Sequence, residues 1–279
     1  MTTLGAIYLP QNPPETLRDV ARAADEAGLD ELWLWEDCFL SGGVSSAAAA
    51  LAWTTNLKVG IGILPVPFRN VAPLAMEISS LERMFPGRVL PGIGHGVQEW
   101  MGQVGVRAAS PLTLLREYAT ALRSLLHGEE VTVSGRYVQL DKVKLDWPSA
   151  AASPLYVAAG GPKTVALTGE VGDGTVLAGG TTPAQVAEAK KLIAATGPHE
   201  IVVFVPTLTG PSAVERLTAA AAHYGDNYIG LAGSVKEIAD GIQEFVEAGA
   251  TRVILQATAG DDPVAYVRWV AEEVRPLVD

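Results

Sequence analysis

The residues Gly160-Gly161-Pro162-Lys163 form the motif of this sequence with the most specific chemistry. They follow a short apolar run, Leu155 to Ala159, and precede a segment with helical spacing. Two glycines free the backbone, and Pro162 suits the first turn of a helix. A helix N-terminus offers unpaired N–H groups and the positive end of its dipole, and Lys163 adds a full charge. The motif therefore predicts a phosphate-binding loop, with a tight turn after a strand as the alternative.

A histidine between two glycines, Gly94-His95-Gly96, ends a second apolar run, Val89 to Ile93. Glycine at the end of a strand usually marks a bulge or a backbone that approaches something closely. His95 is a candidate to bond a cofactor ring or to act as an acid or base. A solvated loop histidine is the alternative.

Eight strand-like runs, each followed by a helical segment, must position these residues. Such alternation predicts a parallel sheet, and right-handed crossovers curl eight units into a closed (β/α)8 TIM barrel. Its active site would lie at the C-terminal ends of the strands. The rival, an open doubly wound sheet, would place Gly-x-Gly-x-x-Gly after the first strand, where this chain has Leu9-Pro10-Gln11-Asn12. The expected strands are Leu4–Leu9, Glu31–Trp35, Lys58–Leu64, Val89–Ile93, Leu155–Ala158, Thr175–Ala178, Ile201–Val205 and Arg252–Gln256.

One segment breaks the alternation between the fourth and fifth strands. Residues 131–140 alternate in polarity around Ser134-Gly135, which predicts a small inserted β-hairpin. The sequence has no low-complexity segment or linker, so we expect a single domain over residues 1–279.

Composition limits the partners and the compartment. The 279 residues are 48% hydrophobic and 18% charged, which fits a globular core. A net charge of −11 argues against nucleic acid or an anionic membrane surface as the partner. The single cysteine, Cys38, cannot form an internal disulfide, and no signal peptide or membrane-length apolar run is evident, so we expect a cytoplasmic protein. His127, His199 and His223 lack ligand-like spacing, so no metal site is expected.

Several motifs together resemble the luciferase-like flavin and deazaflavin oxidoreductases. They are Phe68-Arg69-Asn70, the segments 81–89 and 92–96, and 234–256 near the C-terminus. The run AAGGPKTVALTGEVGDGTVLAGG, residues 158–180, is most similar to the F420-dependent branch. The resemblance implies a homodimeric oxidoreductase that passes a hydride between coenzyme F420 and a small organic substrate. An FMN-dependent monooxygenase and a non-catalytic flavin- or deazaflavin-binding barrel are the alternatives.

The resemblance also implies roles for particular residues. Members of the family have a bulge with a non-proline cis peptide behind the cofactor ring, and the matching bond is Gly62–Ile63. On this basis we expect Gly62→Val to weaken cofactor binding more than folding. Asp37 falls on the family's strand-two acid, so Asp37 and His95 are the catalytic candidates.

Two departures from the family pattern limit the transfer of a substrate. Cys38 stands where a histidine is usual, and Val97 stands where the sugar-phosphate dehydrogenases carry a glutamate. We expect Cys38 to be a packing residue rather than a nucleophile, because no base is assigned beside it. The residues expected to bind the cofactor are Tyr8, Glu36, Cys38, Gly62, Ile63, Leu64, Gly94, Gly96, Ala159, Gly160, Gly161, Pro162, Lys163, Leu177 and Ala178.

Overall fold

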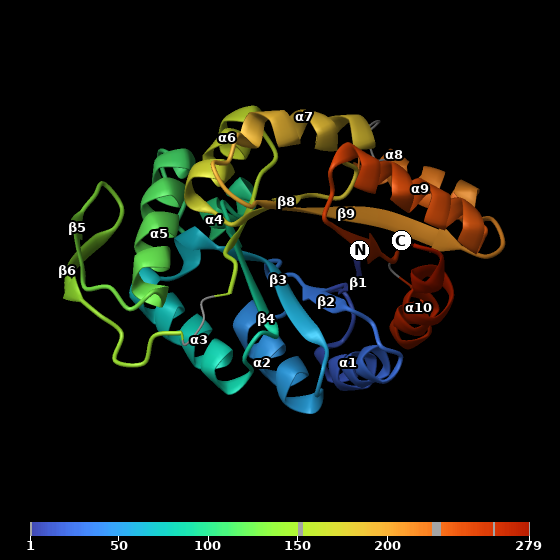
Figure 1. Cartoon of the computed structure of the whole chain (residues 1–279), viewed down its shortest axis with the longest axis horizontal. Coiled ribbons are helices and arrows are strands. Elements are labelled where there is room, and N and C mark those ends of the chain that lie inside the picture. Colours follow the sequence, from blue (N-terminus) through green and yellow to red (C-terminus); the bar gives the residue numbers. More distant parts are fainter. Residues whose placement is uncertain (1, 150–152, 225–229, 259, 279) are drawn as a thin grey trace.

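The computed structural model describes residues 2–149, 153–224, 230–258 and 260–278, and its centre is a closed barrel of eight parallel strands (Figure 1). The strands follow the order β9-β11-β1-β2-β3-β4-β7-β8, and β8 pairs with β9 to close the wall. The (β/α)8 barrel predicted from the sequence is therefore confirmed. The barrel strands are β1 Thr3–Tyr8, β2 Glu31–Leu34, β3 Lys58–Pro65, β4 Val89–Gly94, β7 Tyr156–Ala158, β8 Gly174–Leu177, β9 Glu200–Thr209 and β11 Arg252–Gln256.

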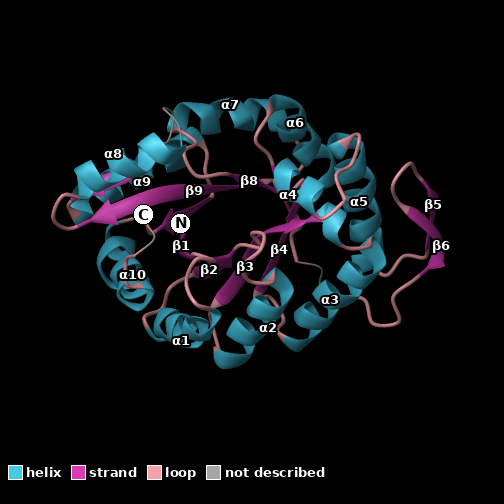
Figure 2. Ribbon diagram, turned by 180° about the vertical axis from the view of Figure 1, so that it is seen from behind, coloured by secondary structure: helices cyan, strands magenta, loops and turns pink. Residues whose placement is uncertain are grey.

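Helices surround the strands on all sides, as Figures 1 and 2 show. Their boundaries follow local chemistry. Helix α9, Val235–Ala248, begins with a reciprocal capping box between Ser234 and Glu237 and ends at Gly249, whose φ is 115°. The others are α1 Leu17–Glu26, α2 Gly43–Trp53, α3 Val71–Met84, α5 Pro111–Leu126, α6 Pro162–Val171, α7 Pro183–Ile193, α8 Ala213–Tyr224 and α10 Pro263–Trp269, which continues as a π-helical turn, Val270–Val274.

Three elements lie outside this plan. The predicted hairpin is confirmed: β5, Val131–Ser134, and β6, Gln139–Val143, are antiparallel and project beside α5 (Figure 2). The carboxylate of Glu117 on α5 holds its turn by accepting three backbone N–H bonds, at 2.8–3.1 Å. Two short elements were not predicted. They are α4, Gln98–Gln103, in a segment expected to be a loop, and β10, Leu231–Gly233, which pairs in parallel with β9.

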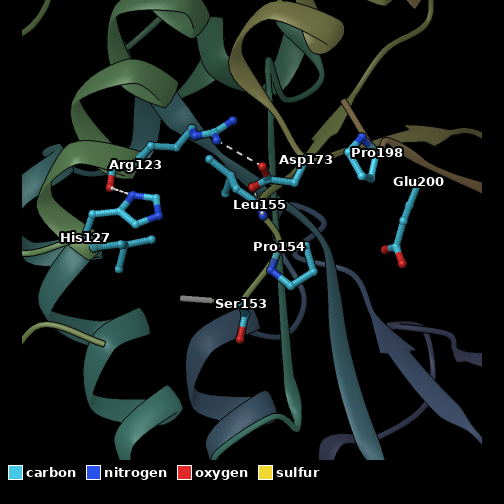
Figure 3. Close-up of a pocket in the computed structure, with 9 residues that line it drawn as sticks. Arg123, His127, Ser153, Pro154, Leu155, Asp173, Pro198 and Glu200 are labelled. Atoms are coloured by element: carbon cyan, nitrogen blue, oxygen red, sulfur yellow. Dashed lines mark hydrogen bonds and ion pairs between the residues drawn. The ribbon is translucent and has the colours of Figure 1, made fainter. Parts of the chain in front are cut away.

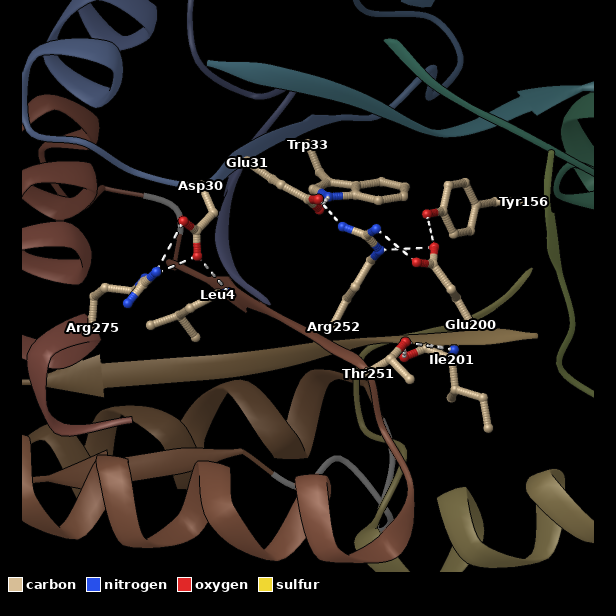
Figure 4. A network of polar contacts seen from close by, with 10 residues as sticks. All are labelled: Leu4, Asp30, Glu31, Trp33, Tyr156, Glu200, Ile201, Thr251, Arg252 and Arg275. Carbon is tan, nitrogen blue, oxygen red and sulfur yellow. Dashed lines mark hydrogen bonds and ion pairs between the residues drawn. The ribbon is translucent and has the colours of Figure 1, made fainter. Parts of the chain in front are cut away.

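A polar network fills the end of the barrel where the strands begin (Figure 4). Arg252, the first residue of β11, makes an ion pair with Glu31, which is fully buried. The same guanidinium binds both oxygens of Glu200 at 2.8 and 3.0 Å. Trp33 Nε1 donates to Glu31 at 2.9 Å, and Tyr156 donates to Glu200. Each buried charge is thus paired, as a low-dielectric interior requires.

No described helix is both long and apolar enough to cross a bilayer. The described residues also include no group of three His, Cys, Asp or Glu side chains placed to hold a metal ion, and the side chain of His223 lies outside those described.

Candidate active site at the mouth of the barrel

A cavity of about 550 Å³ opens at the C-terminal ends of the strands, where barrel enzymes place their active sites. Its volume lies in the usual range for small-molecule sites, and most of its wall is apolar. The loops after β2, β4 and β7 contribute to it. The lining residues are Trp35, Glu36, Asp37, Gly62, Ile63, Pro65, His95, Gly96, Val97, Trp100, Ala158, Ala159, Gly160, Val176, Ala178, Gly179 and Phe204.

A second cavity of about 670 Å³ adjoins this mouth cavity on the side of α6 and α7. The two share four lining residues, Ala159, Gly160, Ala178 and Gly179. An elongated ligand can therefore place one end among the strand ends and the other beside the N-terminus of α6. The other residues of this second cavity are Pro162, Val165, Leu177, Gly180, Thr181, Gln185, Glu188, Ala189 and Leu192.

The loop before α6 presents open backbone donors. The N–H groups of Gly160, Gly161 and Lys163 have no acceptor among the described residues. A Cβ built on either glycine meets no atom within 4 Å, so there is room beside the loop. The Lys163 side chain is exposed and lines neither cavity. Donors, dipole and space together suit an anionic group.

Two buried polar atoms belonging to the mouth cavity's lining residues lack partners among the described residues. They are Nδ1 of His95 and Nε1 of Trp35. The other ring nitrogen of His95, Nε2, forms a 3.2 Å hydrogen bond with Thr164 Oγ1. Burial lowers the pKa of His95 and outweighs the opposing effect of the Pro111 backbone, so the ring is neutral near pH 7. Both residues line the mouth cavity, but these two atoms are themselves shielded from solvent.

The two acids after β2 have different environments. Glu36 is held in place because Arg69 donates to both of its oxygens, at 2.8 and 2.7 Å, and the N–H of Gly43 donates at 3.0 Å. The carboxylate of Asp37 receives no hydrogen bond from the described residues, although it lines the mouth cavity. Burial raises the pKa of Asp37. Of the two acids, Asp37 is therefore the one without a charge or hydrogen-bond partner among the described residues.

The strand-three bulge is present, but one expectation about it is wrong. The Gly62–Ile63 bond is cis, as predicted, and the β3–β4 register shifts between Ile61 and Leu64. Ile63 lines the mouth cavity. A Cβ on Gly62, however, would lie 2.6 Å from the Phe204 ring and 3.0 Å from Trp33. A larger side chain there would disturb barrel packing, so Gly62→Val is not a selective probe of binding.

The remaining predicted residues occupy varied positions. Tyr8 is buried, and its hydroxyl donates to the carbonyl of Pro13 at 2.8 Å, away from the cavity lining. Leu64 is fully buried in the core. Pro162 and Leu177 line the second cavity only. Cys38, Gly94, Gly161 and Lys163 line neither cavity, and the Cys38–Phe39 bond is a second cis peptide that the sequence did not predict.

Another cavity, of about 380 Å³, lies at the opposite end of the barrel (Figure 3). Arg123 on α5 and His127 just after it form one wall. Asp173, just before β8, and Glu200, the first residue of β9, form the other. Arg123 and Asp173 make a 3.0 Å ion pair. In barrel enzymes this end of the strands usually contributes to stability, and the active site lies at the other end.

The sequence model of the luciferase-like monooxygenases matches residues 1–229. The chain belongs to this family. This luciferase-like chain is 34% identical, over 194 residues, to a 5,10-methylenetetrahydromethanopterin reductase from Methanolobus tindarius, covering 69% of the chain and 59% of that relative. It is 34% identical over 186 residues to an F420-dependent glucose-6-phosphate dehydrogenase from Kineococcus radiotolerans, covering 61% of the chain and 54% of that relative. The chain thus spans a little over half the length of these curated relatives.

Solved structures with the same fold include one enzyme described with F420 and another described with FMN. An F420-dependent secondary alcohol dehydrogenase, in complex with an F420–acetone adduct, superimposes on the luciferase-like chain with a TM-score of 0.87 and 20% identity, covering 100% of the chain and 99% of that structure. The oxygenating constituent of 3,6-diketocamphane monooxygenase from Pseudomonas putida, in complex with FMN, gives 0.77 and 18%, covering 100% and 99%. At these identities the likeness establishes the fold.

Sequence reasoning missed several residues that line the mouth of this luciferase-like barrel. Trp35, Trp100 and Phe204 all line the cavity. A signal was available for Trp35, because alternate residues of a strand share a face and Trp33 is inside the barrel.

Proposed function

We propose that this chain is an oxidoreductase that binds coenzyme F420 and transfers a hydride between it and a small organic substrate. The observation that carries the proposal is the pair of adjoining cavities, which meet beside the open N–H groups before α6. F420 has a three-ring system joined to a phosphate and a polyglutamate tail, which suits such a bipartite space. The two relatives described above, whose names concern methanopterin and F420 chemistry, support the choice.

The residues present fit this group. Gly160, Gly161 and Lys163 would hold the phosphate through their free N–H groups. The ring would lie in the mouth cavity against Ile63. The bound cofactor supplies the acceptance and donation of hydride, and the protein supplies position and proton control.

Proton control would come from Asp37 and His95. Transfer of a hydride to or from a carbon–oxygen bond also moves a proton at the oxygen. A neutral His95 can accept that proton, and Asp37, whose pKa is raised by burial, can hold or return one. Both line the same cavity.

Titrating the protein with F420 and, separately, with FMN tests the proposal. Absorbance and fluorescence of each cofactor report its binding directly. We expect the dissociation constant for F420 to be at least tenfold below that for FMN, which corresponds to about 1.4 kcal/mol. Equal or tighter FMN binding would move the chain to the monooxygenase alternative, because both cofactors carry a phosphate that the loop can bind. Tight F420 binding without turnover of any alcohol or carbonyl compound would favour a cofactor-binding protein.

A further inference from the structure

We propose that the substrate of the mouth cavity is an uncharged, largely apolar alcohol or carbonyl compound, and that phosphorylated or carboxylated substrates are rejected. The inference deepens the proposed function and rests on it, since it assigns the molecule that shares the cavity with the cofactor. It predicts that this chain, unlike a sugar-phosphate dehydrogenase, does not accept a phosphorylated substrate, because its cavity holds no cation.

The walls of the mouth cavity favour apolar contact. Trp35, Trp100 and Phe204 supply aromatic surface, and Ile63 and Val97 supply aliphatic surface. Trp35 and Phe204 lie against each other with ring centroids 5.9 Å apart. Val97 is 47% exposed, so it marks the entrance rather than the core. Burial of an apolar substrate against such walls is favourable in proportion to the area removed from water.

The cavity offers no cation to an anionic substrate. No Lys or Arg is among its lining residues, and the stretches outside the described residues contain none in the sequence. Arg69 contacts a lining residue, but its two terminal nitrogens each donate to Glu36, so its charge is already paired. His95 stays neutral because burial lowers its pKa. The charged groups of the lining are the acids Glu36 and Asp37.

An anionic substrate group would therefore lose its water and face the unpaired carboxylate of Asp37, since the charge of Glu36 is balanced by Arg69. Desolvating a charge without a partner is costly, and placing it beside a like charge adds to that cost. The open donors of the Gly160–Gly161 loop do not remove this cost, because they lie at the phosphate end of the proposed cofactor position. A neutral substrate avoids both the desolvation cost and the charge repulsion.

The two titratable side chains Asp37 and His95 suit a substrate with one oxygen that changes its protonation. Oxidising an alcohol breaks the C–H bond with its electron pair leaving as hydride, which reduces the oxidised deazaflavin, and the O–H proton passes to a protein base. The carbon–oxygen bond becomes C=O, and reduction of a carbonyl runs the same steps backwards. The Asp37 carboxylate and the neutral imidazole of His95, both on lining residues, are the proton acceptors nearest such an oxygen.

A matched pair of ligands tests the charge rule. Cyclohexanol and 4-hydroxycyclohexanecarboxylate share ring and hydroxyl and differ by one negative charge; glucose and glucose 6-phosphate form a second pair. Binding is measured by quenching of tryptophan fluorescence, with and without F420, and kcat/KM is measured with F420. We expect cyclohexanol to bind at least about tenfold more tightly than its carboxylate partner. Equal or tighter binding of the carboxylate, binding of neither ring compound, or efficient use of glucose 6-phosphate would overturn the proposal.

A charge added at the entrance gives an independent test. Val97→Lys should improve binding of the carboxylate relative to cyclohexanol by about fivefold, since one partly exposed cation then faces the anion. Val97→Gln is the matched polar control and should leave the ratio unchanged. An unchanged ratio in Val97→Lys would contradict the argument. If the protein prefers the neutral compounds but the F420 spectrum does not change on mixing, the proposed cofactor is wrong and the proposed substrate class stands. Failure of the proposed function can thus be told apart from failure of the substrate proposal.

Discussion

Replacing Gly161 with valine should separate cofactor binding from folding. Gly161 has φ −117° and ψ 157°, an extended conformation that valine adopts readily, and a Cβ there meets no atom within 4 Å. Valine is a poorer N-cap than glycine by about 1 kcal/mol. Loss of freedom in the unfolded chain offsets about 0.5–1 kcal/mol of that. We therefore expect the free energy of unfolding to stay within about 1 kcal/mol of the wild type.

Binding should change far more. The valine methyls would occupy the space beside the free N–H groups, so a phosphate could no longer approach all of them. Losing one charge-assisted hydrogen bond costs about 2 kcal/mol, which weakens binding about 30-fold. Because F420 and FMN share the phosphate, both should be affected whichever is the natural cofactor.

The assay pairs spectral titration of each cofactor with urea denaturation of the free protein. Gly197→Val is the matched control, because Gly197 is exposed, lies between α7 and β9, and also has no atom within 4 Å of a built Cβ. The control should bind both cofactors as the wild type does. Wild-type affinity in Gly161→Val, or loss of affinity only through unfolding, would refute a phosphate position at this loop.

Three further predictions concern stability and are checked by urea denaturation. Gly62→Val should lower the free energy of unfolding by about 3 kcal/mol through overpacking, and a wild-type midpoint would contradict the packing described. Glu36→Gln should cost about 2 kcal/mol by leaving the partly buried Arg69 without its charge partner, whereas the same change at the exposed Glu170 should cost under about 1 kcal/mol; equal costs would count against this. For Asp25, burial raises the pKa, but three backbone N–H donors from residues 55–57 outweigh it and hold the pKa below its ordinary value. This contribution is present above the unfolded pKa of about 3.9 and is lost as pH falls through the lower folded value, so Asp25→Asn should flatten the stability curve below about pH 4.

The barrel could be predicted because its signals are local. Buried parallel strands are short apolar runs, and helices announce their ends through residues such as Ser234 and Gly249. Counting such units gave the closed barrel, and strand ends gave the location of the site. His95 became a candidate this way, since it directly follows β4, whereas Asp37, three residues after β2, became one through the family resemblance.

The remainder depends on contacts that local patterns do not encode. The direction of the Gly62 hydrogens follows from how β3 packs on Phe204, more than 140 positions later in the chain. Lys163 was expected at the cofactor on charge alone, yet the start of α6 leaves its side chain exposed and outside both cavities. The bond between Glu36 and Arg69, which spans 33 positions, likewise has no signature in spacing.

The network at the closed end of the barrel bears on how the chain is made. Glu31 belongs to a strand that leaves the ribosome early, while Arg252 follows it by 221 positions. β11, which carries Arg252, is the strand that joins β1 to β9. A growing chain without it has two open strand edges and a buried carboxylate with no counter-charge, both of which favour aggregation. The barrel can therefore close only after β11 has been synthesised, and Arg252 on that strand supplies the counter-charge for Glu31.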